Sequence, residues 1–475
     1  MNAGTAREAW MDIDLRALAR RAPVHFAGIG GAGMSALAEL VLRSGGRVTG
    51  CDAKSGPVTD MLAALGAEIF VGHDAAHVAD VAAVVCTSAM PSNHPELAAA
   101  RAAGIPVLKR AQALGALVNR GTLLAVAGTH GKTTTTAMAA AILTEASLNP
   151  TSFVGGTVGA WGSGLRAGSE TLFVVEADEY DRSFFTLRPD VVVLTSVEPD
   201  HLDVYGTAEA VDEAFRDFVD LLPKQGLLAA CADDEGALRV LEYRGAGSLG
   251  YGTSDTASLR AVEVQAVGRG SRFTVRDRGS DLGSVDLGAP GLHNVRNALG
   301  ALAAARHAGA DFASAQRALA TFTGVDRRLQ ELGTAGGVTV IDDYAHHPTE
   351  IAASIEGCRA AYPGRPVVAV FQPHLFTRTR DFADAFGHAL AEADAVWVTD
   401  VYPAREAPIP GVSGERIAAS ARTANAAVEY VEDLDSLADL VVRALRPGDV
   451  CLVMGAGDID RVAHEAILRL RLVEA

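Results

Sequence analysis

The strongest chemical signal in the sequence is a short loop rich in glycine and threonine, Gly128-Thr129-His130-Gly131-Lys132-Thr133-Thr134. A strand-like segment, residues 123–128, leads into it, and a helical segment, residues 135–146, follows it. In such a loop the backbone N–H groups surround phosphate oxygens, the lysine pairs with the β- and γ-phosphates, and the next hydroxyl can bind Mg²⁺. The loop therefore predicts a nucleoside triphosphate site, although Val126 stands where the general pattern has its first glycine.

Two acidic runs can supply oxygen ligands to a metal ion bound with those phosphates. The first, Glu176-Ala177-Asp178-Glu179, follows the β-branched segment 171–175, and the second, residues 198–203, follows the segment 191–195. Both segments suit buried parallel strands, so the acids are expected at the carboxyl ends of strands. Mg²⁺ prefers oxygen ligands and retains waters, so one or two carboxylates suffice. The alternative, solvated loops, is the weaker interpretation beside a phosphate loop.

A second glycine-rich turn lies near the N-terminus, Gly28-Ile29-Gly30-Gly31-Ala32-Gly33. A strand precedes it and a helix, residues 34–43, follows, while Asp52 ends the next strand at the spacing of a ribose-binding acid. A diphosphate can rest on the N–H groups of that helix. Taken alone, the pattern is typical of dinucleotide-binding oxidoreductases. A tight turn without a ligand is the alternative, and a UDP-sugar would use the same physics.

The elements that must position these loops alternate between strand-like and helix-like segments almost throughout, which predicts an α/β fold with largely parallel sheets. Sheets open at residues 24–28, 123–128 and 338–343, so we expect three domains, at 1–120, 121–325 and 326–475. In the third domain, strands at 366–371, 395–400 and 450–454 each end in a polar or glycine-rich loop. A charged, glycine-rich stretch, residues 260–288, predicts antiparallel strands.

Composition and charge argue against a nucleic-acid-binding, a secreted or a membrane protein. The formal net charge of −17 argues against a nucleic-acid-binding surface, because such a surface is usually basic. The five cysteines lie far apart without a C-x-x-C pair, so we interpret each as a small buried residue whose free thiol fits a reducing cytoplasm. Residues 1–21 lack the apolar core of a signal peptide, and no segment is long and apolar enough to span a bilayer. We therefore expect a cytoplasmic protein without membrane contact.

Taken together, these motifs resemble those of the Mur ligases in order and spacing. The resemblance rests on the phosphate loop, on the acidic runs, and on residues 291–298 and 326–328. Five further stretches resemble the branch of the family that acts on UDP-N-acetylmuramate and L-alanine; they are residues 25–35, 342–350, 371–374, 377–380 and 400–406. The resemblance covers nearly the whole chain, from about residue 23 to residue 460.

The resemblance implies an ATP-dependent amide-forming ligase of peptidoglycan precursor synthesis, with ATP and Mg²⁺ as cofactors. It also implies a Rossmann-like UDP-binding domain, a P-loop ATPase-like central domain and a Rossmann-like C-terminal domain that binds the amino acid. The expected partners are the small molecules UDP-N-acetylmuramate and L-alanine, and the protein is expected to be a monomer or homodimer. A sister ligase that adds another amino acid or a recycled peptide stays open as the alternative.

The resemblance also implies a role for individual residues. The UDP-sugar is expected at Gly28, Gly30, Gly31, Gly33, Asp52 and Ser88. ATP is expected at Gly128, Thr129, His130, Gly131, Lys132, Thr133, Thr134, His293, Asn294, Asn297, Arg328 and Asp343. The expected metal-binding residues are Thr133, Glu176 and His201, and the expected amino-acid-binding residues are Tyr344, His346, Arg378 and Arg380. The catalytic residues are expected to be Lys132, His201, His346 and Arg378.

Two departures from the family pattern stand out. Leu329 follows Arg327-Arg328, where the family commonly has phenylalanine. Several Mur ligases use a carbamylated lysine after the second acidic run, but here no lysine lies between His201 and Lys224. We therefore expect that no carbamylated lysine is used.

Overall fold

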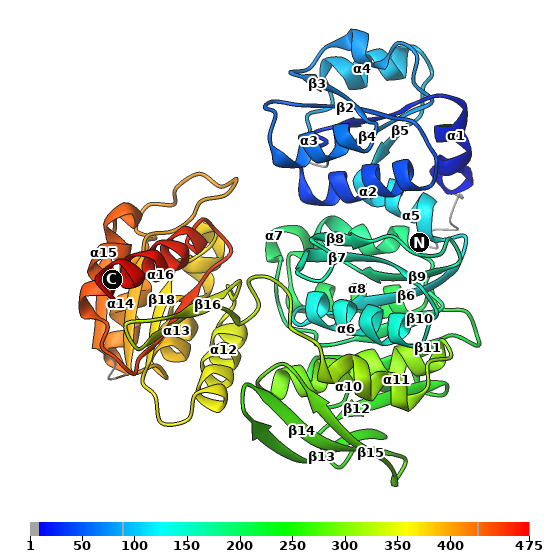
Figure 1. The fold of residues 1–475 in the computed structure, drawn as a ribbon. Coiled ribbons are helices and arrows are strands. Elements are labelled where there is room, and N and C mark those ends of the chain that lie inside the picture. Colours follow the sequence, from blue (N-terminus) through cyan, green and yellow to red (C-terminus); the bar gives the residue numbers. More distant parts are fainter. Residues whose placement is uncertain (1–8, 88–89, 425–426, 475) are drawn as a thin grey trace. The chain divides into compact units, whose positions relative to one another are not determined.

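The computed structural model describes residues 9–87, 90–424 and 427–474. They form an α/β fold of three domains, each with its own sheet flanked by helices (Figure 1). Internal contacts divide the chain into two compact units. The first unit runs to Arg260 and includes Arg276–Ser280 and Asn297–Ala318, and the second consists of Ala261–Val275, Asp281–Arg296 and the chain from Leu319 onward.

The N-terminal sheet is parallel throughout, with the strand order β3-β2-β1-β4-β5. The order reverses between β1 and β4, which is where open α/β sheets bind ligands. The strands are β1 (Val24–Ala27), β2 (Val48–Asp52), β3 (Glu68–Val71), β4 (Ala83–Cys86) and β5 (Val107–Lys109). The helices are η1 (Ala9–Asp12), α1 (Leu15–Arg21), α2 (Ala32–Arg43), α3 (Pro57–Ala64), η2 (Ala75–Val78), α4 (Pro95–Ala102) and α5 (Arg110–Val118).

The central sheet has ten strands in the order β15-β14-β13-β12-β11-β10-β6-β9-β7-β8. Its first strand, β6 (Thr122–Ala127), lies between β9 (Leu172–Glu176) and β10 (Val191–Leu194) and is parallel to both. The other strands are β7 (Thr151–Val158), β8 (Ser163–Arg166), β11 (Leu227–Cys231), β12 (Ser248–Gly252), β13 (Leu259–Val267), β14 (Gly270–Asp277) and β15 (Ser280–Leu287). The helices are α6 (Lys132–Glu145), η3 (Tyr180–Thr186), α7 (Leu202–Tyr205), α8 (Ala208–Val219), α9 (Glu235–Arg244), α10 (Leu292–His307) and α11 (Phe312–Ala320).

The C-terminal sheet has six strands in the order β16-β17-β21-β18-β19-β20, and β16 alone among its described pairings is antiparallel to its neighbour. The strands are β16 (Gln330–Ala335), β17 (Val338–Asp343), β18 (Val367–Phe371), β19 (Ala395–Thr399), β20 (Ala427–Val431) and β21 (Val450–Met454). The helices are α12 (Pro348–Ala361), α13 (Phe376–Leu390), α14 (Gly414–Thr423), α15 (Leu434–Ala444) and α16 (Asp460–Glu474).

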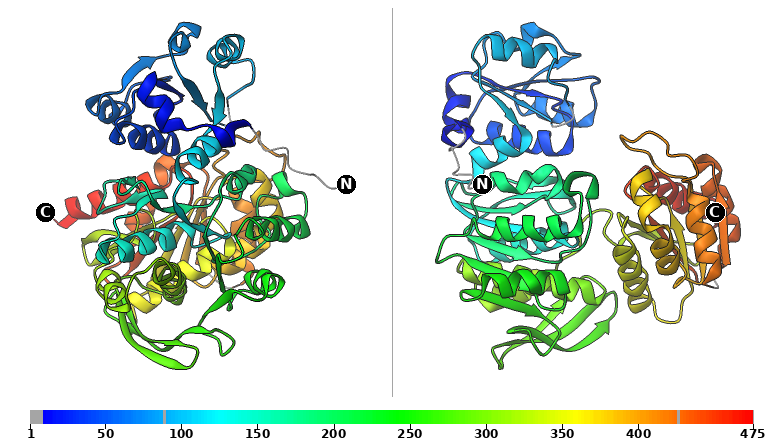
Figure 2. Two further views of the ribbon diagram at one scale, coloured as in Figure 1. Left: turned by 90° about the vertical axis from the view of Figure 1, so that its right-hand side faces the viewer. Right: turned by 180° about the vertical axis from the view of Figure 1, so that it is seen from behind.

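Helices cover both faces of the C-terminal sheet, as two further views show (Figure 2). On β21, Val450 and Leu452 face α12, α13 and α14, whereas Cys451 and Val453 face α15 and α16. This alternation follows from the two-residue period of a strand. Because both faces are buried, the strands consist of nearly continuous apolar runs, and truncating a fully buried side chain such as Phe371 to alanine costs about 3–5 kcal/mol.

The α/β class, the three domains and the first two sheet openings are confirmed. The third opening was wrong, because the C-terminal sheet begins one strand earlier, at β16, which pairs antiparallel with β17. The predicted helices begin earlier than expected, at Ala32 and Lys132, because each starts directly after a glycine at its N-cap. Seven strands were not predicted: β3, β7, β8, β11, β12, β16 and β20. Most of their sequences mix glycine or charged residues with the apolar ones. Within the described ranges, none of the helices combines the length and the apolar character that crossing a bilayer requires.

Candidate active site

The phosphate loop joins β6 to α6, and two glycines give it a backbone shape that other residues adopt poorly. Gly128 has φ +132° and Gly131, the N-cap of α6, has φ +78°. A Cβ atom at Gly131 would lie 2.5 Å from the side-chain oxygen of Asn297, and one at Gly128 would collide with Thr195 and Ser196. The loop therefore stays bare of side chains where its N–H groups must approach an anion.

Lys132 is the first residue of α6, and its ammonium folds back over the loop. Its Nζ donates to the carbonyls of Gly128 at 2.5 Å and Thr129 at 3.1 Å. The same Nζ lies 2.9 Å from both carboxylate oxygens of Glu179. Both side chains are largely buried, so the contact is a charge pair that water screens little.

Electrostatics keeps this lysine charged. Burial lowers the pKa of Lys132, but the carboxylate of Glu179, with Asp178 and Glu176, outweighs burial and raises that pKa above its ordinary value. Burial raises the pKa of Glu179, while the Lys132 ammonium opposes the rise. The loop thus holds a protonated amine next to the buried carboxylate of Glu179.

Glu176 ends β9 and faces the hydroxyl of the loop. The Oγ1 of Thr133 donates to Glu176 Oε1 at 3.0 Å, and the backbone N–H of Gly155 donates to Oε2 at 2.6 Å. A Cβ at residue 155 would lie 2.9 Å from the carboxylate, so Gly155 also makes room for it. A hydroxyl and a carboxylate oxygen side by side are ligands that Mg²⁺ prefers.

His201 lies at the N-cap of α7 with φ 52°, in the left-handed region. Its Nε2 is 3.8 Å from Glu179 Oε1 and 3.7 Å from Asp200 Oδ2. The phenol of Tyr205 donates to the carbonyl of Glu179 at 2.5 Å and fixes this backbone from the other side. Glu179 therefore links Lys132 to His201.

The remaining loop residues are held by the segment after β10. Glu198 donates its N–H to Thr129 Oγ1 at 2.9 Å, and His130 donates its N–H to Ser196 Oγ at 2.9 Å. The His130 ring is 3.5 Å from the Glu198 carboxylate. Thr134 is buried within α6.

Five predicted residues of the central domain are therefore gathered at the carboxyl ends of β6, β9 and β10: Gly131, Lys132, Thr133, Glu176 and His201. Asn297 lies beside them, since its side-chain oxygen occupies the space that a Cβ at Gly131 would need. Sequence reasoning did not assign Glu179, although it stands in the same acidic run as Glu176. The acidic run was visible in the sequence, but the positions of its acids along the chain could not show which of them reaches Lys132.

The N-terminal glycine turn resembles the phosphate loop in construction, since it joins the end of β1 to the start of α2. The N–H of Gly30 donates to Asp52 Oδ2 at 2.9 Å, which ties the turn to the end of β2. Gly28 has φ +79°, and Gly31 is the N-cap of α2. A Cβ at Gly33 would lie 2.9 Å from the guanidinium of Arg110. Ser88, also predicted here, lies outside the described residues.

The second unit contains the other predicted nucleotide residues. Asp343 accepts the N–H groups of Leu329 and Ala345, both at 2.7 Å. Burial raises the pKa of Asp343 to about 6, against the opposing effect of Arg328. His293 is desolvated, which lowers its pKa to about 4, so the imidazole is neutral at pH 7. Asn294 donates to the carbonyl of Pro290 at 2.7 Å.

The predicted amino-acid-binding residues separate into two kinds. Tyr344 stacks under the guanidiniums of Arg327 and Arg328, 5.0 and 5.2 Å from its ring centre. His346 donates its Nδ1–H to the Tyr344 carbonyl, 2.9 Å away.

On α13, Arg378 is buried, whereas Arg380 is exposed and pairs with its neighbour Asp381 at 2.7 Å. Residues two apart on a helix do not share a face, so the two arginines point in different directions.

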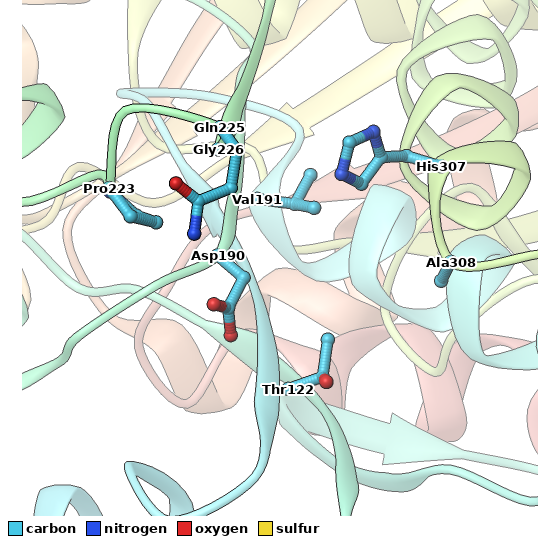
Figure 3. Close-up of a pocket in the computed structure, with 8 residues that line it drawn as sticks. All are labelled: Thr122, Asp190, Val191, Pro223, Gln225, Gly226, His307 and Ala308. Carbon is cyan, nitrogen blue, oxygen red and sulfur yellow. The ribbon is translucent and has the colours of Figure 1, made fainter.

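A hollow of about 200 Å³ lies at the opposite end of the central sheet (Figure 3). Its lining includes Thr122 and Val191, the first residues of β6 and β10, together with Asp190 and His307. The phosphate loop follows the other end of β6, so this hollow does not belong to the candidate site.

Three family models match successive parts of the chain. The model described as Mur ligase family, catalytic domain, matches residues 23–122, the Mur ligase middle domain matches residues 126–305, and the Mur ligase, glutamate ligase domain, matches residues 327–457.

Individual relatives match over the same length. The chain is 46% identical over 465 residues to the UDP-N-acetylmuramate–L-alanine ligase of Renibacterium salmoninarum, covering 96% of this chain and 97% of the relative. It is 44% identical over 456 residues to the enzyme of that name from Salinibacter ruber, covering 96% of each. The crystal structure of UDP-N-acetylmuramate-alanine ligase from Thermotoga maritima matches with a TM-score of 0.79 at 30% identity, covering 95% of this chain and 100% of that one. A murein peptide ligase from Psychrobacter arcticus matches with a TM-score of 0.68 at 26% identity, covering 96% and 100%.

Replacing Gly131 with alanine tests whether the loop needs its bare N-cap. Gly45→Ala is the matched control, because Gly45 has φ +77° and nothing within 4 Å of the added Cβ. Both variants should lose about 1–2 kcal/mol of stability from the left-handed backbone. Only Gly131→Ala, which also displaces Asn297, should weaken ATP binding, by about tenfold or more. Equal ATP affinities of the two variants in calorimetric titrations would contradict the assignment.

The raised pKa of Asp343 predicts a pH-dependent stability of the C-terminal domain. The folded protein holds this proton more tightly than the unfolded chain, so the stabilisation is complete below the ordinary pKa of 3.8 and is lost as pH rises through about 6. It amounts to about 3 kcal/mol. Urea unfolding between pH 4 and 7 should therefore show a shallower decline for Asp343→Asn. The control Asp384→Asn, at an exposed position, should follow the wild type.

Proposed function

The chain belongs to the Mur ligase family, and we propose that it joins L-alanine to the lactyl carboxylate of UDP-N-acetylmuramate through an acyl phosphate formed with ATP. The two relatives named UDP-N-acetylmuramate–L-alanine ligase, which are 46% and 44% identical to this chain over almost its whole length, support this substrate pair. The geometry that carries the proposal is Lys132 at the N-terminus of α6, with Thr133 and Glu176 beside it. Small molecules are the partners of this reaction, in the cytoplasm, with the protein a monomer or homodimer.

The loop suits a triphosphate and Mg²⁺ in charge and in ligand type. The N–H groups at the start of α6 and the Lys132 ammonium would hold the β- and γ-phosphates. Thr133 and Glu176 would hold Mg²⁺, with His201 close by through Glu179. When bound, Mg²⁺ neutralises charge on the phosphoryl oxygens. Lys132 then exchanges its Glu179 partner for phosphate oxygens.

In the first step the lactyl carboxylate attacks the γ-phosphorus of ATP, the bond to the bridging oxygen breaks, and ADP leaves. Phosphoryl transfer depends mainly on positioning and on neutralising charge. Lys132 would do both by pairing with the phosphate oxygens. His293, Asn294 and Asn297 would contact the nucleotide. Arg328 and Asp343 would approach it from the C-terminal domain.

In the second step the amine of L-alanine attacks the acyl carbon, the amide bond forms, and inorganic phosphate leaves. The attacking amine must lose a proton, and His201 or His346 is the base. The buried guanidinium of Arg378 can hold the amino acid's carboxylate through two parallel hydrogen bonds. Tyr344 and Arg380 complete the amino-acid-binding set, with Arg380 released from Asp381.

The N-terminal domain would hold the uridine diphosphate. Its glycine turn presents N–H groups at the start of α2, and Gly28, Gly30, Gly31 and Gly33 leave room for the diphosphate. Asp52, fixed at the end of β2 by Gly30, would bind the ribose. Ser88 is proposed at the same site.

A panel of amino acids tests the substrate pair. Phosphate release from ATP in the presence of UDP-N-acetylmuramate should be stimulated most by L-alanine, with glycine and L-serine as the nearest competitors in size. The same assay with a preformed tripeptide in place of the amino acid tests the alternative, a sister ligase that adds a recycled peptide. Absence of stimulation by L-alanine, or a stronger response to the tripeptide, would refute the proposal.

Lys132→Ala tests the phosphate loop. The variant should lose phosphate release, because no other ammonium replaces the one that holds the β- and γ-phosphates. Its circular dichroism should match the wild type. Lys224→Ala removes an exposed lysine beyond α8 and serves as the control. Turnover by Lys132→Ala at the rate of the control would exclude the proposed role of the loop.

A further inference from the structure

A group of metal-binding side chains lies in the N-terminal domain, on residues to which the proposed reaction gives no part. We call it the Glu96 cluster: His25 on β1, Cys51 on β2, His77 on η2 and Glu96 in the first turn of α4. One possible ligand atom from each lies within 4.8 Å of those of the other three. His25, Cys51 and Glu96 are fully buried.

The Glu96 carboxylate is the centre of the cluster. Its Oε2 lies 3.2 Å from Cys51 Sγ and 3.6 Å from His25 Nε2, and its Oε1 lies 2.8 Å from His77 Nδ1. A buried carboxylate is thus enclosed among nitrogen and sulfur atoms.

One ring nitrogen of His25 is buried without a hydrogen-bond partner. Its Nδ1 is 3.0 Å from the hydroxyl of Thr49, while its buried Nε2 has no hydrogen-bond partner and faces Glu96. When the Nδ1–H donates to Thr49, Nε2 presents a lone pair to a carboxylate. Two buried electron-rich groups in this arrangement call for a cation between them. A histidine whose far nitrogen is fixed by a hydrogen bond is the usual form of a metal ligand.

We infer that the Glu96 cluster binds one zinc ion, with His25 Nε2, Cys51 Sγ, His77 Nδ1 and one Glu96 oxygen as its four ligands. Zinc takes nitrogen, sulfur and carboxylate ligands in a tetrahedron whose ligand atoms lie roughly 3.3–3.8 Å apart. The separation of 3.6 Å between His25 Nε2 and Glu96 Oε2 falls within that spacing, and that of 3.2 Å between Cys51 Sγ and the same oxygen is slightly shorter. Zn²⁺ displaces the thiol proton of Cys51 to solvent, and the thiolate and carboxylate then balance its charge.

The surroundings favour zinc over the harder cations. A thiol and two imidazoles are poor ligands for Mg²⁺, which selects oxygen. Phe70 stacks on the His77 ring with centroids 4.3 Å apart and fixes its orientation. Val78 and Leu97 close the cluster from the apolar core. With four protein ligands and no open position, the site would stabilise the domain rather than catalyse a reaction.

Two more histidines give the ion a way in. The Nδ1 atoms of His73 and His94 lie 3.7 and 3.9 Å from Glu96 Oε2. The His73 side chain is 31% exposed and that of His94 is 10% exposed. They therefore connect the buried ligands with solvent, and an ion can pass along them before it reaches the four inner ligands.

The test uses the full chain, stripped with a chelator and kept free of nucleotide. Titration with Zn²⁺ against a chromophoric chelator should give one tight site per chain. Titration with Co²⁺ should produce the visible bands of a tetrahedral ion and a near-ultraviolet thiolate-to-cobalt band. Zn²⁺ should also raise the melting temperature.

Variants identify the ligands. Cys51→Ser should remove the near-ultraviolet band, and Thr49→Val, which only frees His25 Nδ1, should weaken zinc binding by about 10–100-fold. Cys51→Ser and Glu96→Gln should weaken it more. Cys86→Ser, at the other buried cysteine of this sheet, and Glu176→Gln, at the phosphate loop, are the matched controls and should keep the ion.

Two results would overturn the inference. One is a wild-type cobalt spectrum without a thiolate band, which decides the question even if the variants fail to fold. The other is zinc binding that Cys51→Ser and Glu96→Gln leave unchanged. Loss of zinc from His73→Ala but not from His77→Ala would refute the assigned ligand set.

Discussion

A buried positive charge at the start of α6 is the constraint on which the central domain depends. Lys132 has little contact with water, so it needs a negative partner at all times, and leaving such a charge unpaired costs about 3–5 kcal/mol. Glu179 is that partner in the structure. In the proposed reaction phosphate oxygens take its place, which makes nucleotide binding an exchange of one anion for another rather than the burial of a new charge.

Parallel sheets explain why the partners of Lys132 meet. β6 lies between β9 and β10, so the loops after all three strands emerge at the same edge. The acids after β9 and the histidine after β10 reach the phosphate loop for this reason alone. The N-terminal domain uses the same arrangement, since its order reverses between β1 and β4, where the glycine turn lies.

In the C-terminal domain, a strained backbone segment and the side chains around it position Arg327 and Arg328. Arg327 and Leu329 have φ of 58° and 46°, a conformation that costs energy for residues with a side chain. The Asp343 carboxylate stabilises it by accepting the N–H of Leu329, and Tyr344 stacks with Arg327 and Arg328. A buried acid, a strained link and an aromatic ring thus fix the direction of two guanidiniums. Leu329 itself packs against the core of this domain, at the position where the family commonly has phenylalanine.

The sequence by itself determined the α/β class, the openings of the first two sheets and the phosphate loop around Lys132, because glycine positions and apolar runs act over a few neighbouring residues. Only the tertiary structure decided that Glu179, rather than another acid of its run, pairs with that lysine. It also separated Arg378, which is buried, from Arg380, which is exposed. The Glu96 cluster shows the same limit, since its members come from four elements with no common motif. Such groupings depend on strand order and helix packing, which bring together residues that are distant in the chain.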